Sequence, residues 1–271
     1  MRDILVHTTN LEQRGNSMRY AAELAALLSG SLSGIFVTEP LVPLPLFGFA
    51  PVYPEYLAAV AKFTEEAKQN EPAFRAWAKR AGVPTSRLLV AEGVLQHALA
   101  NAVNWHDVLV LESHAKAHWS QVSLLGEVVV NCGAPCIVVP EAYTFPVKLD
   151  TVLLAWDGSV EAVRAAHAAL PLLRRARSVV VIDGAGEGAN AYLHPPSLEG
   201  ELARHGIAFE RRVVDVSGEG AGEYILDTAW QMNADLLVMG AYGHARFSEW
   251  MFGGATRHVL TFAQLPVLIR H

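Results

Sequence analysis

The sequence predicts an α/β protein made of two tandem doubly wound domains, each a parallel sheet with helices on both faces. Short apolar runs alternate with longer helical patterns along the 271 residues of the chain. The runs lack the polar alternation of a half-exposed strand, which is typical of strands covered on both faces. Strands that alternate with helices in this way predict parallel neighbours joined by right-handed crossovers.

An internal repeat divides the chain into two halves. Three apolar runs of the first half return in the same order in the second half, which predicts a duplicated unit joined near residues 143–148. We therefore expect one domain over residues 1–146 and a second over residues 147–271. The matched runs are 3–7 with 151–155, 107–111 with 235–239, and 134–140 with 265–270.

Apolar periodicity predicts the elements of the first half. Ala21, Leu24, Ala25 and Leu28 form one apolar face of its first helix. Pro72 is expected to kink or break a long helix at 55–81, because proline lacks the N–H donor of the helix ladder. The predicted strands are 4–7, 31–37, 87–91, 107–111 and 136–139, and the helices are 17–28, 55–81, 94–104 and one before the last strand.

The second half repeats this order with a smaller insertion. Ligands of doubly wound sheets bind outside the carboxyl ends of the strands, where the strand order reverses, so the site is expected there. The densest basic group, at residues 174–177, is explained by a helix C-terminus. The predicted strands are 152–156, 178–182, 209–214, 235–239 and 267–270, and the helices are 160–173, 197–205, 222–231 and 255–263.

Composition and charge exclude several classes of protein. A hydrophobic share of 52% and a charged share of 18% indicate a compact globular chain. A net charge of -6 without a lysine or arginine block argues against a nucleic-acid partner. The N-terminus turns polar by His7, too early for a signal peptide, and no segment reaches the length of a membrane span. We therefore expect a cytoplasmic protein with no membrane partner.

Two further segments have alternative interpretations. Cys132 and Cys136 lie one helical turn apart, a spacing that suits a metal pair, but no other Cys or His stands beside them at ligand spacing. Buried structural thiols in a reducing compartment are therefore favoured. The proline-rich apolar stretch at residues 41–52 is expected to cover apolar surface of its own domain or its partner, with an interaction site for another protein as the alternative.

The stretch at residues 234–256 carries the clearest site signal. Its apolar run ends at Gly240, Gly243 follows, and Gly253 and Gly254 open a helical pattern. Glycines let backbone N–H groups approach a phosphate closely, and a helix start adds free donors and the positive end of its dipole. The alternative is that the glycines serve only a tight turn and a helix cap. Two glycine groups at this spacing favour a phosphate loop, although neither the Walker loop nor the dinucleotide fingerprint is present.

With Gly240, Gly243 and Gly253 in the spacing Gly-x2-Gly-x9-Gly, the sequence resembles the universal stress proteins, whose nucleotide-binding members carry this pattern followed by Ser or Thr. The resemblance covers the whole chain and is stronger in the second half. It implies the family's fold, a five-stranded α/β layer sandwich of the adenine nucleotide α-hydrolase-like type that pairs through its last strand. Gly254 departs from the pattern, because it stands where the family has a hydroxyl, and Thr256 is the nearest substitute.

The resemblance also implies which residues bind an adenine nucleotide. Asp157 matches an aspartate that contacts the nucleoside, and the alternative role for it is a charge at the start of a helix that Ser159 can already cap. His167, His194, His205 and His258 have no carboxylate or nucleophile at recognisable spacing and are interpreted as structural or surface residues. The predicted binding residues are Ala155, Asp157, Val181, Met239, Gly240, Gly243, His244, Gly253 and Gly254.

The function that these patterns favour is ATP binding by the second domain of a stress-response sensor or regulator that acts on a protein client. Mg²⁺ would enter with the nucleotide. No catalytic triad, metal cluster or acid–base pair emerges, so we expect at most slow hydrolysis. The alternative is a family member that binds no nucleotide and acts through protein contacts or another small ligand, and adenylate chemistry comes third. We expect the two halves to form a pseudo-dimer through residues 137–139 and 267–269, with a homodimer of chains as a further arrangement.

Only the second half is expected to bind nucleotide. Thr9, Glu112 and Ala115 stand where the second half has Asp157, Gly240 and Gly243, and the loop before the last helix is shorter by about three residues in our alignment. A carboxylate about 4 Å from a phosphate charge costs on the order of 4 kcal/mol at an effective dielectric of about 20. That free energy corresponds to roughly a thousandfold in affinity.

Overall fold

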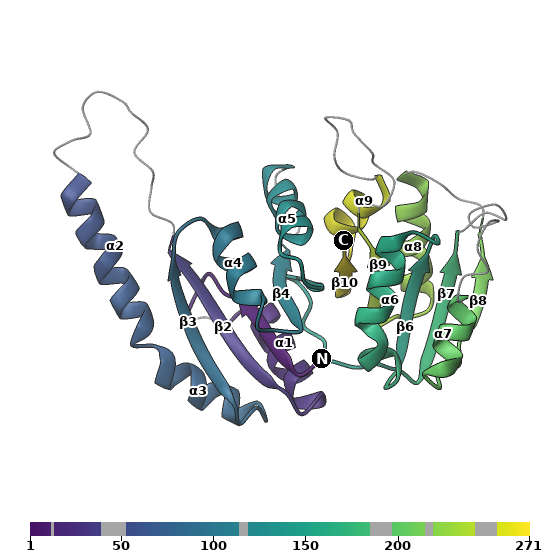
Figure 1. The fold of residues 1–271 in the computed structure, drawn as a ribbon, viewed down its shortest axis with the longest axis horizontal. Helices are drawn as coiled ribbons and strands as arrows, with labels where there is room; N and C mark the ends of the chain where they lie inside the picture. Colours follow the sequence, from purple (N-terminus) through teal and green to yellow (C-terminus); the bar gives the residue numbers. More distant parts are fainter. Residues whose placement is uncertain (12–13, 39–52, 114–118, 185–196, 215–218, 242–253) are drawn as a thin grey trace. The chain divides into compact units, whose positions relative to one another are not determined.

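The structure, a computed structural model, describes residues 1–11, 14–38, 53–113, 119–184, 197–214, 219–241 and 254–271 (Figure 1). The predicted proline-rich cover at residues 41–52 lies outside these ranges. The chain divides into two compact units, Met1–Leu111 and Glu112–His271. Within the described residues, no helix combines the length and the apolar character needed to cross a membrane.

The first unit is a parallel sheet with helices. Its strands lie in the order β3-β2-β1-β4, so the strand order reverses between β1 and β4. The predicted break in the long helix is confirmed, because α2 ends at Lys68 and Pro72 lies in the first turn of α3, where the missing N–H costs no helix bond. The elements are β1 (Asp3–His7), α1 (Asn16–Leu27), β2 (Ser31–Thr38), α2 (Tyr53–Lys68), α3 (Glu71–Arg80), β3 (Ser86–Glu92), α4 (Leu95–Val103) and β4 (Val108–Ser113).

The second unit is a larger sheet in the order β5-β10-β9-β6-β7-β8, in which every pair is parallel except β5 with β10. The strand order reverses between β6 and β9. Figure 1 shows α6 and α7 on one face of this sheet and α8 on the other. The elements are α5 (Trp119–Asn131), β5 (Cys136–Pro140), β6 (Thr151–Trp156), α6 (Val160–Leu173), β7 (Ser178–Asp183), α7 (Leu198–Arg204), β8 (Glu210–Val213), α8 (Glu219–Gln231), β9 (Leu236–Gly240), α9 (Gly254–Phe262) and β10 (Val267–Arg270).

The core of the second unit explains why the strand predictions succeed. Leu153, Leu154, Leu237 and Val238 are completely buried, as expected for central strands covered on both faces. All predicted strands and helices are present, and the largest shift at a helix start is in α8, which begins at Glu219 and not at residue 222. The doubly wound α/β class is therefore confirmed.

The pairing of β5 with β10 confirms the prediction that residues 137–139 and 267–269 meet. The two strands run antiparallel, with Ile137 opposite Leu268 and Val138 opposite Val267. α5 also contacts α9 and β10, and these contacts place α5 and β5 in the second compact unit. The repeat boundary at residue 146 stays a prediction from the sequence.

Candidate functional site

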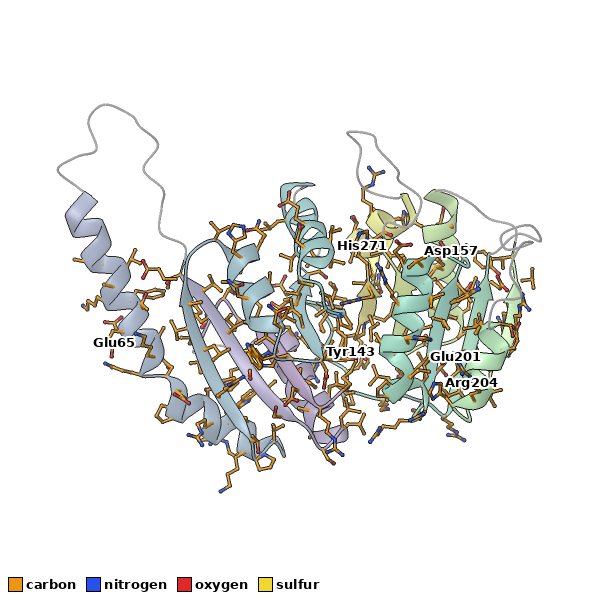
Figure 2. All side chains as sticks on the ribbon, in the orientation of Figure 1. Glu65, Tyr143, Asp157, Glu201, Arg204 and His271 are labelled. Atoms are coloured by element: carbon orange, nitrogen blue, oxygen red, sulfur yellow. The ribbon has the colours of Figure 1, made fainter. Side chains whose placement is uncertain are left out.

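The candidate site lies at the carboxyl ends of β6 and β9, where the strand order of the second unit reverses. Ala155 of β6 is in register with Met239 of β9. Gly240 is the next residue after Met239, and Asp157 is the second residue after Ala155. Figure 2 shows Asp157 and the C-terminal His271, which follows β10, at the same end of the sheet. The structure therefore brings together four of the predicted residues at the position where doubly wound sheets bind ligands.

The turn from β6 into α6 is tightly fixed by Asp157 and Ser159. Oδ1 of Asp157 accepts a hydrogen bond from the backbone N–H of Ser159 at 3.0 Å and another from its hydroxyl at 2.6 Å. The hydroxyl oxygen of Ser159 in turn accepts from the N–H of Ala162 at 3.1 Å and so caps α6. Gly158 between them has a φ of 74°, which a side chain would disfavour. Asp157 remains exposed, so it supports the helix start and still presents its carboxylate to solution.

Gly240 is required by close packing of α6. A Cβ at this position would lie 2.6 Å from the backbone nitrogen of Ala162 and 2.7 Å from the carbonyl carbon of Glu161. The φ of Gly240 is not in the left-handed region, so the turn itself does not demand glycine. For this residue, the interpretation as a packing glycine is the one that the contacts support. The same contact brings the positive N-terminal end of α6 to the end of β9.

The connection from β9 to α9 contains the remaining glycines of the pattern. β9 ends at Gly240 and α9 begins at Gly254, so thirteen residues join them. Gly243, His244 and Gly253 lie outside the described residues. Gly254 is the first residue of α9, as the sequence predicted. Thr256 is 5% exposed and already has an interaction within the protein, so the substitute hydroxyl is turned into the fold and away from solution.

β7 ends at Asp183, two residues after the predicted binding residue Val181. Val181 is completely buried within β7, in register with Leu154 and Arg211, so its side chain offers no surface to a ligand. Asp183 ends the strand, is also buried, and pairs with Arg211 of β8. Arg211 also forms an ion pair with Glu199, in which Nη1 of Arg211 lies 2.5 Å from Oε1 of Glu199. In the sequence, Asp183 ends an apolar run and Arg211 stands in the next predicted strand. The sequence alone did not indicate that Asp183 and Arg211 form an ion pair.

His167 on α6 and His205 after α7 both lie next to the carboxylate of Glu201, which the sequence did not indicate as their partner. Nε2 of His205 lies 3.0 Å from Oε1 of Glu201, and Nε2 of His167 lies 3.5 Å from the same oxygen. Glu201 also pairs with Arg204 one turn along α7, and Figure 2 shows these two side chains together. Within the described parts of the chain, no group of three or more His, Cys, Asp or Glu side chains is arranged to hold a metal ion.

The fold is that of a doubly wound α/β protein whose strand order reverses between β6 and β9 in the second unit. The sequence model of the universal stress protein family matches residues 148–271. The second domain, residues 148–271, therefore belongs to the universal stress protein family.

Proteins of similar length resemble this chain in sequence or in structure. A universal stress protein of Synechocystis sp. is 26% identical over 296 residues, which cover 99% of each chain. The crystal structure of a universal stress protein from Archaeoglobus fulgidus DSM 4304 covers 99% of this chain and 96% of its own, with 16% identity and a TM-score of 0.72. A functionally unknown protein from Pseudomonas aeruginosa PAO1 covers 100% of this chain and 92% of its own, with 14% identity and a TM-score of 0.58.

Proposed function

We propose that the second domain binds ATP at the carboxyl ends of β6 and β9, and that the protein is a cytoplasmic stress-response sensor or regulator whose contacts with a client protein depend on the bound nucleotide. One observation carries this proposal. The spacing Gly240-x2-Gly243-x9-Gly253 spans the connection between the end of β9 and the start of α9, next to the point where the strand order reverses. Glycines at this position leave backbone donors open to phosphate oxygens.

Charges at the crevice indicate how the nucleotide would be oriented. Asp157 and Glu161 stand at the start of α6, so a polyphosphate there would meet two carboxylates. The first turn of α9 contains no acidic residue, and its free N–H groups favour an anion. We therefore place the phosphates at α9 and the nucleoside near Asp157, where a carboxylate accepts hydrogen bonds from hydroxyl or amino groups.

A Mg²⁺ ion would be held mainly by the nucleotide. Mg²⁺ commonly binds through phosphate oxygens, waters and one or two carboxylates, so it requires no protein cluster. Asp157 lies on the nucleoside side of this arrangement, so phosphate oxygens and waters would supply the ligands of the ion. The ion would neutralise part of the negative charge of the phosphates and so weaken their repulsion by Asp157 and Glu161 at the start of α6.

A second candidate function is a regulator that binds no nucleotide and acts through protein contacts or another small ligand. The residues at the start of α9 favour this second function. Gly254 supplies no hydroxyl, and the nearby hydroxyl of Thr256 is buried. A nucleotide would therefore lose one contact that hydroxyl-bearing relatives would make, and its phosphates would depend on backbone donors.

Calorimetric titration of the full chain with ATP and Mg²⁺ distinguishes the two functions. We expect saturable binding by the unaltered protein, and a loss of affinity of at least about a hundredfold in Gly243→Val, because the valine side chain blocks two or more backbone donors to phosphate. Gly200→Val is the matched control, since Gly200 is exposed on α7 and a Cβ there meets only the hydroxyl of Ser197 at 3.4 Å.

Two results would overturn parts of this proposal. Unchanged ATP affinity in a folded Gly243→Val protein would remove the phosphate loop. No binding of ATP, ADP or AMP by the unaltered chain would favour the second function, which could then be tested by capture of client proteins with and without added nucleotide.

A further inference from the structure

The two cysteines of the chain form a close pair beside the antiparallel strands of the second unit. Cys132 follows the last residue of α5, and Cys136 opens β5. Their Sγ atoms lie 3.3 Å apart, and both residues are free thiols and buried. A disulfide has an S–S length of about 2.05 Å, so closure requires an approach of only about 1.3 Å. Gly133 between them has a φ of 68° and is exposed, which puts the turn at the protein surface.

A half-buried arginine, Arg270, acts on this pair. Cys136 is in register with Ile269 of β10, and Arg270 is the next residue along that strand. Nη1 of Arg270 is buried and has no hydrogen-bond partner among the described residues. A buried guanidinium nitrogen without an acceptor is costly, and a thiolate nearby reduces that cost. The positive charge of Arg270 acts on both sulfur atoms.

The surroundings of the two thiols shift their pKa values in opposite directions, which makes Cys132 the nucleophile. The hydrogen bond from the Cys136 thiol lowers the pKa of Cys132 to about 7, with smaller help from Arg270 and against the opposing effect of burial. The same hydrogen bond and complete burial raise the pKa of Cys136. Of the two thiols, Cys132 is therefore the one that ionises at the lower pH, with the Cys136 thiol beside it as a donor. Redox-sensing cysteines have a low pKa, lie next to a resolving thiol and are reached by solvent. Cys132 meets the first two conditions, and its 4% exposed surface lies beside the exposed Gly133.

We infer that Cys132 and Cys136 are a redox-active pair that a small peroxide closes into an intrachain disulfide, with Arg270 as the residue that positions the reactive charge. The Cys132 thiolate attacks one oxygen of hydrogen peroxide, breaks the O–O bond, and becomes a sulfenic acid as hydroxide leaves. The sulfur of Cys136 then attacks the sulfenic sulfur. The S–S bond forms, and the sulfenic hydroxyl leaves with the Cys136 proton as water. The hydroxide released in the first step takes up the proton that Cys132 lost on ionising, so two thiols and one peroxide give one disulfide and two waters.

The pair is close to the candidate ligand site in the sheet. Arg270 is in register with Gly240 of β9, and its carbonyl oxygen accepts the N–H of Ala241 at 2.8 Å. Oxidation removes the thiolate beside Arg270, one strand away from the end of β9. The inference does not depend on nucleotide binding, because it rests on the two sulfur atoms and the arginine.

Differential alkylation of the folded, reduced full chain tests the pair. The protein is treated with hydrogen peroxide, free thiols are blocked with iodoacetamide, and the sample is reduced and labelled with N-ethylmaleimide before mass spectrometry. We expect both cysteines to carry the second label, and the intact chain before reduction to weigh two hydrogen atoms less. Two thiols that remain open to iodoacetamide, or a disulfide that joins two chains, would overturn the inference.

Single cysteine variants test the order of the steps. In Cys136→Ser, dimedone is expected to trap a sulfenic acid at Cys132, because no thiol is left to resolve it. In Cys132→Ser, Cys136 is expected to stay unlabelled under the same peroxide treatment. Labelling of Cys136 in preference to Cys132 would contradict the assignment of the nucleophile.

Charge variants test the role of Arg270. Arg270→Gln is expected to slow alkylation of Cys132 at pH 7 severalfold, and Arg270→Lys is expected to keep most of the rate. Circular dichroism confirms that each variant is folded. An alkylation rate of Cys132 in folded Arg270→Gln equal to that of the unaltered chain would show that Arg270 plays no part. If Arg270→Gln does not fold, Arg270→Lys takes its place. A Cys132 alkylation rate in that variant as low as in the urea-unfolded chain would likewise contradict the role of the positive charge.

Discussion

The first strand of each half leads into its helix in a different way. Three residues join β6 to α6, whereas eight join β1 to α1. Ser159 caps α6 with its side chain, but Gly15 at the start of α1 makes no side-chain cap. The short, capped junction brings the first turn of α6 against the end of β9, and that contact explains why Gly240 has no room for a side chain.

The connections before the last helices differ even more. Thirteen residues join β9 to α9, and only five join β4 to α5. The prediction of a shorter loop in the first half is therefore right in direction, but its size was wrong: the difference is eight residues (13 − 5) and not three. In the first half Glu112, within β4, also stands where the second half has Gly240.

The two halves have the same order of strands, and they differ in the connections that follow the carboxyl ends of those strands. Buried apolar strands tolerate few changes, because each fills a packed core. The loops at the carboxyl ends face solution and change freely, and they carry the ligand contacts of doubly wound folds. One scaffold can therefore hold a binding site in one half and none in the other.

The largest expected effect on stability is that of filling the space at Gly240. We expect Gly240→Ala to lower the free energy of unfolding by about 1–3 kcal/mol, because the new methyl group meets backbone atoms of α6 that cannot move independently. Urea unfolding followed by circular dichroism measures the change. Gly200→Ala is the control, with no loss of stability expected at its exposed helical position. Equal stability of Gly240→Ala and the unaltered chain would show that α6 does not press on β9.

Removing the carboxylate of Asp157 is expected to weaken ATP binding about tenfold, which is the loss of one hydrogen bond worth about 1.4 kcal/mol. Asp157→Ala removes both the ligand contact and the acceptor for Ser159. Asp157→Asn keeps an oxygen acceptor for Ser159 and is expected to lose less affinity. Calorimetric titration of both variants checks this order. If both bind ATP as the unaltered chain does, Asp157 serves only the helix start.

The helix caps give the smallest effects and compare the two junctions directly. Ser159→Ala is expected to cost about 1 kcal/mol of stability, because the N–H of Ala162 loses its acceptor. Gly15→Ser, which offers α1 a side-chain cap, is expected to gain a few tenths of a kcal/mol. Thermal and urea unfolding of the two variants measure the changes. A gain in Gly15→Ser as large as the loss in Ser159→Ala would mean that the two helix starts differ only in the capping residue.

The sequence predicted the scaffold well because its signals are local. Strands such as Leu236–Gly240 are short unbroken apolar runs, and helices such as Val160–Leu173 follow a capping serine, so period and capping are enough to place them. Pro72 likewise marked the break between α2 and α3, since the consequence of a proline in a helix depends on few neighbours.

The site was predicted less completely because it depends on contacts between distant segments. The sequence shows that Gly240 is a glycine, but only the approach of α6 shows that packing requires it. Val181 was named as a binding residue only from the resemblance; its side chain is buried within β7, and its role at the site stays a prediction. The pairing of Asp183 with Arg211 was not predicted. The spacing of Cys132 and Cys136 also did not predict their contact. A separation of four residues is one turn of a helix, but the chain leaves α5 and enters β5 between these two residues.

The number of ATP molecules bound by one chain tests the central comparison most directly. Calorimetric titration of the full chain, at protein concentrations above the dissociation constant, gives this number from the equivalence point. We predict one ATP per chain, bound by the second domain and lost in Gly243→Val. Saturation at two ATP per chain, with one site surviving in Gly243→Val, would contradict the account, because it would show that the short loop and Glu112 of the first half do not prevent binding.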